Sequence, residues 1–148
     1  MQKKLEVLKK VAKILNDNDI TWNLGASCML YLRGIVEMFD DIDIMVSEED
    51  VLKVESLFSS FESTIKPPNN QYKTKRFIEY VIDGVDIDVM AGFIIVNKGK
   101  DYYFPLSKGT QSEKIILDGV SINLESAETW LRYYELMERK DKVILLKK

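Results

Sequence analysis

Two pairs of aspartates, each separated by one isoleucine, are the strongest candidates for chemistry in this 148-residue sequence. Asp41 and Asp43 form the first pair, and Asp86 and Asp88 form the second. On a strand, residues two apart point to the same face, so the two acids of each pair share a face. Side-by-side carboxylates repel each other, and a divalent cation held between them relieves that repulsion. Oxygen ligands of this kind suit Mg²⁺, Mn²⁺ or Ca²⁺.

One such pair alone is equally compatible with a strand face that is turned to solvent. The repetition of the pattern on a second strand favours the metal interpretation. If the two strands are neighbours, three or four carboxylates converge, and such a charge cluster needs a cation to be tolerated.

The absence of histidine and the single cysteine exclude several other kinds of active site. Without histidine there is no Ser-His-Asp or Cys-His catalysis and no histidine general base or metal ligand. Cys28 alone forms neither an internal disulfide nor a cysteine cluster for zinc or iron–sulfur, and one cysteine fits a reducing compartment. Catalysis in this chain would depend on carboxylates, hydroxyls, Lys or Arg, together with a hard metal ion.

Charge and hydropathy limit the partners and the location that we expect. The 21 Lys and Arg against 24 Asp and Glu give a net charge of −3, whereas a protein that coats nucleic acid needs a basic surface. The sequence therefore favours a small or protein partner over a long nucleic acid. No run of about 18 apolar residues predicts a membrane-spanning helix, and the first ten residues lack the apolar core of a signal peptide. We expect a cytoplasmic protein that does not enter a membrane.

Apolar periodicity and turn signals predict an α+β fold with a mixed sheet flanked by helices. We expect helices at residues 3–15, at 27–33 and from Ser47 to about 58, and strands at 20–24 and 41–46. Asp83-Gly84 and Asp118-Gly119 suit tight turns with positive φ, so they predict hairpins over residues 77–90 and 115–124. Ser126 begins a helix that continues to about residue 138, and residues 91–114 stay unassigned.

The segment Gly25-Ala26-Ser27 lies between a predicted strand and a predicted helix. Small residues there let backbone N–H groups approach a phosphate, and Ser27 offers a hydroxyl donor. Taken alone, the tripeptide is better explained as a tight turn with Ser27 as the helix cap. Its place just before the Asp41 strand favours the phosphate interpretation.

Lys73 and Arg76 are further candidates for phosphate contacts, but basic residues that protect an edge strand are at least as common.

The order of these features resembles the nucleotidyltransferase superfamily with a catalytic core of the DNA polymerase β type. That family has an apolar residue, Gly, a small residue and Ser, and then, after a short helix, Asp-apolar-Asp-apolar. Residues 24–27 and 41–44 match this pattern, and the match as a whole covers about residues 20–90. The third carboxylate of the family lies among apolar residues, as Asp88 does, and Asp86 is the alternative on the same face.

The C-terminal part is similar to small bacterial nucleotidyltransferase-like proteins of the abortive-infection and antibiotic-modifying groups. Two departures from the family pattern are Ala26, where many members have a second glycine, and Phe39-Asp40, where a small hydroxyl residue is common. The resemblance implies one nucleotidyltransferase-like domain over residues 1–148. Its core would span about residues 20–90, and a C-terminal hairpin with helices would span about 113–148.

The resemblance also implies a mechanism. Asp41, Asp43 and Asp88 would hold two Mg²⁺ or Mn²⁺ ions that bridge the phosphates of a nucleoside triphosphate, and Gly25 and Ser27 would bind the β and γ phosphates. The chain would transfer a nucleoside monophosphate to a hydroxyl of a small molecule or a protein and release pyrophosphate.

Two alternatives stay open beside this hypothesis. The same fold serves as a non-catalytic or weakly catalytic partner in toxin–antitoxin or phage-defence pairs. The chain is alternatively a catalytically inactive domain, although the complete set of three acids argues against that interpretation.

Overall fold

A computed structural model describes residues 1–148 and contains five α-helices, one 3₁₀ turn and nine strands. No helix in it combines the length and the apolar character that crossing a membrane requires. The elements follow one another as α1 (Gln2–Asp17), β1 (Trp22–Gly25), α2 (Ala26–Leu32), β2 (Ile42–Val46), η1 (Glu48–Asp50), α3 (Val51–Leu57), β3 (Glu62–Ile65), β4 (Arg76–Ile82), β5 (Val85–Ala91), β6 (Phe93–Asn97), β7 (Lys100–Phe104), β8 (Glu113–Leu117), β9 (Val120–Leu124), α4 (Ala127–Leu136) and α5 (Lys140–Leu146).

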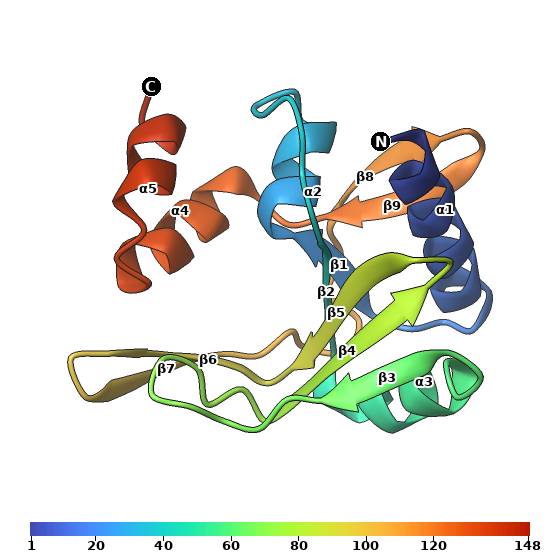
Figure 1. Cartoon of the computed structure of the whole chain (residues 1–148), viewed down its shortest axis with the longest axis horizontal. Helices are drawn as coiled ribbons and strands as arrows, with labels where there is room; N and C mark the ends of the chain where they lie inside the picture. Colours follow the sequence, from blue (N-terminus) through green and yellow to red (C-terminus); the bar gives the residue numbers. More distant parts are fainter.

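Seven of the strands form one mixed sheet in the order β3-β4-β5-β2-β1-β9-β8. β2 runs parallel to β5, and β1 runs parallel to β9, whereas the other neighbours are antiparallel. Strands β6 and β7 form a separate hairpin, which extends away from the large sheet in Figure 1. The predicted α+β architecture with a mixed sheet is therefore confirmed.

The two faces of the large sheet have different roles. On one face, the indole Nε1 of Trp22 donates to Asn16 at the end of α1 (3.0 Å), and Phe58, just after α3, packs edge-on against Tyr80 of β4 (5.2 Å). Helices α1 and α3 cover this face and form the main core with it. Because side chains alternate along a strand, the strand residues next to those of this core point to the opposite face of the sheet, and Asp43 is one of them. That second face carries the candidate site.

The two hairpins predicted from Asp-Gly pairs are present with the expected backbone. Asp83 and Gly84 have φ of 52° and 79°, and Asp118 and Gly119 have φ of 49° and 82°. The β6–β7 hairpin was not predicted, because its turn is Lys98-Gly99 rather than Asp-Gly or Asn-Gly. Strand β3 was not predicted either, since all four of its residues are exposed and show no apolar alternation.

The prediction of one helix that begins at Ser47 is corrected in its details. A 3₁₀ turn over Glu48–Asp50 precedes α3, and the Ser47 hydroxyl does not cap a backbone N–H. It donates instead to the buried carboxylate of Asp50 (2.8 Å). Asp50 also accepts from the Thr21 backbone N–H (2.9 Å) and from the Lys108 ammonium group (2.8 Å). A buried carboxylate with three donors recruits the nearby hydroxyl, because a hydrogen bond to a charged group is stronger than one to a neutral group.

Candidate active site

A row of side chains crosses the middle of the large sheet at one level. Asp43 on β2 is the register partner of Asp88 on the parallel strand β5, so the two carboxyl groups lie side by side. Gly25 on β1 is the partner of Asp43 on the other side, and Glu79 on β4 is the partner of Asp88. The two Asp-Ile-Asp segments therefore bring one acid each together, because β2 and β5 are direct neighbours, whereas the expected cluster of three or four carboxylates is not present.

The environment of this pair disfavours negative charge on both carboxyl groups. Burial raises the pKa of Asp88 to about 6, with contributions from Asp41, Glu79 and Asp86. Burial and the neighbouring Asp88 raise the pKa of Asp43 well above its usual range. In addition, Oδ1 of Asp88 is buried without any hydrogen-bond partner. Such an orphaned acceptor is costly in a folded protein, and a cation bound between the two acids would satisfy it.

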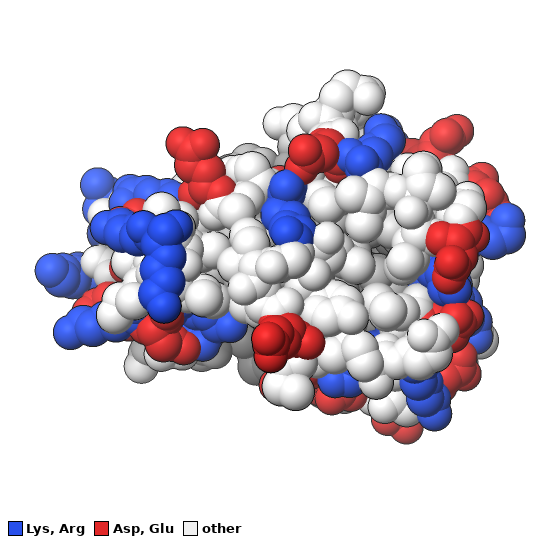
Figure 2. Space-filling view, turned by 90° about the horizontal axis from the view of Figure 1, so that it is seen from above, with Lys and Arg blue, Asp and Glu red and all other residues white.

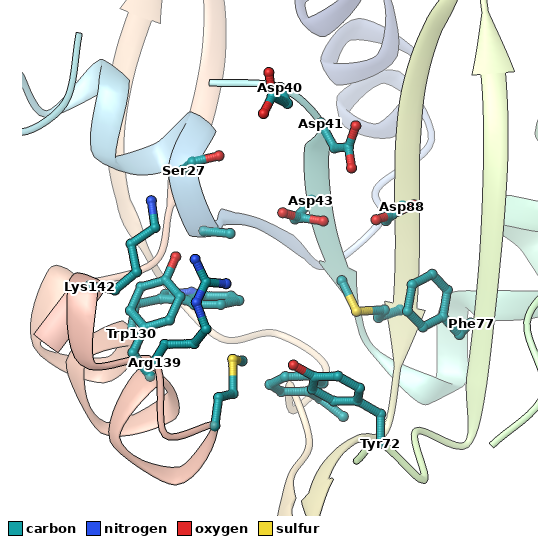
Figure 3. Close-up of a pocket in the computed structure, with 15 residues that line it drawn as sticks. Ser27, Asp40, Asp41, Asp43, Tyr72, Phe77, Asp88, Trp130, Arg139 and Lys142 are labelled. Atoms are coloured by element: carbon teal, nitrogen blue, oxygen red, sulfur yellow. The ribbon is translucent and has the colours of Figure 1, made fainter. Parts of the chain in front are cut away.

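The pair forms part of the wall of a pocket of about 410 Å³. Carboxylates lie on one side of this pocket, and the cationic side chains of Arg139 and Lys142 reach into it from the opposite side (Figure 3). Lys and Arg gather at the same end of the molecule, where α5 and the β6–β7 hairpin lie (Figures 1 and 2). The remaining wall is largely aromatic and apolar, with Tyr72, Phe93 and Tyr134 among its members. This arrangement accommodates a ligand with a polyanionic part and an apolar, planar part.

The remaining acids of the two motifs take different positions. Asp41 comes just before β2 and lines the pocket together with Asp40, and burial together with Asp86 raises the pKa of Asp41. Asp86 is exposed and does not line the pocket, whereas Asp88 does. The structure contains no group of three or more Asp, Glu, His or Cys side chains close enough to hold a metal ion together. The oxygen donors thus form a close pair, Asp43 and Asp88, with Asp41 nearby.

The Gly25-Ala26-Ser27 segment joins β1 directly to α2, as predicted, but its small residues have different physical reasons. Ala26 and Ser27 line the pocket, and Ala26 has a φ of 51°, the left-handed conformation that glycine would adopt more easily. Gly25 has ordinary extended backbone. A Cβ at Gly25 would lie 2.5–2.7 Å from atoms of the Trp130 indole. Its small size therefore makes room for a side chain of α4.

Lys73 and Arg76 do not line the pocket. Lys73 pairs with Asp101 on β7 (3.6 Å). Arg76 forms a two-point ion pair with Glu55 on α3 (2.6 and 3.0 Å). Strand alternation explains the orientation of Arg76, because it shares the helix-covered face with Tyr80, while Glu79 faces the carboxylates.

The basic wall of the pocket was missed as a site by sequence reasoning. Arg139 begins the segment that leads into α5, and Lys142 lies within α5. The charged cluster 139–142, with three basic residues and one acid, was visible in the sequence, but nothing in its spacing connects it to the Asp43 segment far earlier in the chain. Trp130 and Tyr134 lie at helical spacing on α4 and read as core residues, which they also are.

Comparisons with known proteins agree with this fold. No protein-family model matches the chain, and no curated protein matches its sequence. A crystal structure from Thermotoga maritima, provisionally described as a nucleotidyltransferase, superimposes with a TM-score of 0.80 at 23% identity and covers 99% of this chain and 92% of that chain. The structure of ANT(2'')-Ia in complex with adenylyl-2''-tobramycin superimposes with a TM-score of 0.60 at 12% identity, over 97% and 87% of the two chains. A solution structure of the antibiotic-resistance factor ANT(2'')-Ia gives a TM-score of 0.57, also at 12% identity, over 90% and 73%. The chain therefore has a nucleotidyltransferase-type fold, as the resemblance in the sequence predicted.

Proposed function

We propose that this protein transfers a nucleoside monophosphate from a nucleoside triphosphate to a hydroxyl group and releases pyrophosphate, with Mg²⁺ or Mn²⁺ as cofactor. The observation that carries the proposal is the Asp43–Asp88 pair on adjacent parallel strands, which faces a cationic wall across one pocket. A triphosphate needs cations on both sides. Arg139 and Lys142 supply them on one side, and metal on the carboxylates supplies them on the other.

The residues present fit a hard divalent cation. Their donors are oxygens only, which is the ligand set of Mg²⁺ and Mn²⁺. A bound cation would satisfy the orphaned Oδ1 of Asp88 and offset the repulsion that raises the pKa of Asp43. Asp43 and Asp88 would hold it, and Asp41 would contribute to a second ion. When bound, the metal neutralises phosphate charge and lowers the pKa of the acceptor hydroxyl.

The chain's own residues would bind and orient the substrates. Arg139, Lys142 and the Ser27 hydroxyl hold the β and γ phosphates, and the aromatic wall with Tyr72 and Tyr134 holds the base and sugar. The acceptor oxygen forms a bond to the α-phosphorus. The bond from that phosphorus to the oxygen bridging to the β-phosphorus breaks, and pyrophosphate leaves with the electron pair. Asp88 would accept the hydroxyl proton as the acceptor oxygen attacks.

In-line displacement determines where the acceptor enters. The attacking oxygen approaches from the side opposite the leaving pyrophosphate. With the pyrophosphate at Arg139 and Lys142, the acceptor would enter from the end of the pocket away from these two residues. A second cavity of about 430 Å³ lies there and shares Tyr72 and Phe77 with the first, and Glu79 is among its lining residues. We propose that a small hydroxyl compound binds in this second cavity. The adenylylated small molecule in the ANT(2'')-Ia complex supports this class over a protein side chain.

Thermal unfolding with each nucleoside triphosphate, with and without Mg²⁺ or Mn²⁺, tests the proposal. A ligand at about 100 times its Kd stabilises the native state by about 2.7 kcal/mol. We expect a metal-dependent rise in Tm that Asp43→Asn removes. Asp86→Asn is the matched control, because Asp86 carries the same charge on the same face of the sheet but lies outside the pocket, and it should keep the full rise. No rise with any nucleotide would contradict the proposal and favour a non-catalytic partner protein.

A further inference from the structure

The side chain of Trp130 is held rigidly at the edge of the pocket. Only 3% of the residue is exposed. Its ring stacks on Phe93 (6.2 Å between centroids) and meets Tyr133 and Tyr134 at 5.0 and 5.4 Å. Trp130 also lines the pocket that contains Asp43, Ser27 and the basic side chains of Arg139 and Lys142. An aromatic side chain packed on three sides has little freedom to adjust its polar atom.

The indole N–H of Trp130 nevertheless has no hydrogen-bond partner and is buried. The second tryptophan of the chain, Trp22, shows the usual situation, because its Nε1 donates to Asn16 Oδ1 at 3.0 Å. A buried donor left without a partner costs free energy, so native proteins rarely leave one unless a ligand or water completes it. The unpartnered N–H therefore calls for an acceptor that the chain itself does not provide.

The position of this N–H indicates which acceptor is meant. A Cβ built on Gly25 would lie 2.6 Å from Trp130 Nε1, so the N–H edge of the indole occupies the place of a side chain at residue 25. Gly25 is the register partner of Asp43 and directly precedes Ala26 and Ser27, which line the pocket. The donor thus belongs to the same row as the carboxylates, at the end nearest to the phosphate-binding segment.

We propose that the Trp130 indole N–H donates a hydrogen bond to a phosphate oxygen of the bound nucleoside triphosphate. This inference rests on the function proposed above and assigns a further binding residue to it. Arg139 and Lys142 attract the triphosphate through charge and hold it on long, flexible side chains. The fixed indole adds a neutral donor with one direction, which selects the position of a single phosphate oxygen. Trp130 is accordingly a phosphate-binding and orienting residue.

The ¹H–¹⁵N indole resonances of the full-length protein test this directly, since the chain has only two tryptophans. Trp22→Phe assigns the two signals. We expect Mg²⁺–tripolyphosphate and Mg²⁺–ATP to shift the Trp130 signal downfield, and adenosine to leave it in place. The Trp22 signal should stay constant throughout. A Trp130 shift with adenosine alone would place the indole against the nucleoside and overturn the phosphate assignment.

A pair of variants gives an independent measurement. Trp130→Phe keeps an aromatic ring and removes the N–H, and we expect it to raise the Kd for Mg²⁺–ATP about tenfold. Trp22→Phe should change that Kd by less than twofold. If wild type binds Mg²⁺–ATP while both the Trp130 signal and the Trp130→Phe affinity stay unchanged, the inference is wrong and the proposed function stands. If wild type binds neither Mg²⁺–nucleotide nor Mg²⁺–tripolyphosphate, the proposed function is wrong, and this inference fails with it.

Discussion

The carboxyl pair of Asp43 and Asp88 makes the stability of the metal-free protein depend on pH. The pKa of each group in the folded protein is above its value in the unfolded chain. For a raised pKa, the folded state binds more protons, so the stability is full below about pH 4 and falls as pH rises through about 6. A bound divalent cation would take the place of those protons.

Replacing Asp88 by Asn should remove much of this dependence. In EDTA at pH 7.5, we expect Asp88→Asn to be more stable than wild type by on the order of 1 kcal/mol, a figure reduced for solvent screening. Urea unfolding at intervals from pH 4 to pH 8 measures it. Asp17→Asn serves as the control and should follow the wild-type curve, because Asp17 is exposed and pairs only with Lys13 at the surface. Parallel curves for wild type and Asp88→Asn would contradict the prediction.

Gly25 should not tolerate even a methyl group while Trp130 is present. A Cβ at this position would lie within 2.7 Å of three indole atoms, and overpacking of a core typically costs about 1–3 kcal/mol. We expect Gly25→Ala to lose that much stability in urea unfolding. The extended backbone at residue 25 is one that alanine adopts without strain, so the loss would come from the contact with Trp130. Trp130→Leu, added to Gly25→Ala, should recover part of the loss relative to the sum of the single changes. Additive losses would show that the contact is not the cause.

Sequence reasoning found the acids of the site but not its cations. The alternation of acidic and apolar residues within a short segment indicates Asp43 and Asp88 as site candidates, and this is a local signal. Arg139 and Lys142 line the pocket only because the chain brings α5 back to it. This is a tertiary contact that no local spacing in the sequence encodes. Arg76 does not line the pocket, because its strand face, fixed by the register of β4, points it to Glu55.

The basic segment from Arg139 through α5 should supply much of the affinity for the triphosphate. We expect Arg139→Ala and Lys142→Ala each to raise the Kd for a Mg²⁺–nucleoside triphosphate about tenfold, since each removes a charge-assisted contact worth about 1.5–3 kcal/mol. Fluorescence or calorimetric titration measures the Kd. Lys147→Ala is the matched control on the same segment, because Lys147 pairs with Glu135 outside the pocket. Equal effects of all three variants would indicate general charge attraction only.

The Asp50 carboxylate joins three segments, namely the start of β1, the turn η1 and the loop before β8. Burial opposes its ionisation, but hydrogen bonds from Lys108, Thr21 and Ser47 hold its pKa below the usual range. A lowered pKa means that this stabilisation is present at neutral pH and is lost as pH falls toward the folded pKa. We expect Asp50→Asn to cost about 1–3 kcal/mol at pH 7. Circular dichroism during urea unfolding measures the loss.

The pH series separates this role from a general surface effect. The difference between wild type and Asp50→Asn should shrink as pH falls below about 4. Asp17→Asn provides the control, since Asp17 makes only an exposed pair with Lys13 (3.3 Å), and such pairs contribute less than about 0.5 kcal/mol. A large loss in Asp17→Asn, or none in Asp50→Asn, would refute the assignment.

Elements with a clear periodic or turn signal were predicted well, and those without one were not. Helix α1 and the Asp-Gly hairpins follow local rules and appear where expected. Strand β3 has no apolar pattern, because it is an exposed edge strand that forms only by pairing with β4. The β6–β7 hairpin lacks a strong turn sequence and is held by Phe93 and Phe104, which pack against Tyr133 of α4. Tertiary contacts decide such elements.

The pocket has walls from two distant parts of the chain, residues 26–93 and residues 130–142. Helix α5 has no fully buried residue, so it belongs among the least stable elements of the fold. A bound triphosphate would link Lys142 to the sheet. We expect Mg²⁺–nucleotide to slow amide hydrogen exchange in residues 140–147 at least tenfold, with a smaller effect in α1. Unchanged exchange in α5 at saturating nucleotide would contradict the expected link between Lys142 and the sheet.

The overall architecture was more predictable than the activity. Three short motifs in the right order were enough to predict the nucleotidyltransferase-type fold, which the comparison structures confirm. One domain, two metal ions and a cytoplasmic location stay predictions. The proposed acceptor site is the second cavity, whose lining comes from residues 66–74 between β3 and β4 and from β4 itself rather than from a motif.

The contact between Gly25 and Trp130 has an evolutionary consequence. Two positions 105 residues apart in the sequence share one volume, so neither is free to change alone. In an alignment of relatives, we expect a small residue at position 25 wherever position 130 carries a large aromatic ring. Lineages with a larger residue at position 25 should have a smaller side chain at position 130. Such lineages would also have lost the indole donor, and they would need another way to orient the phosphate.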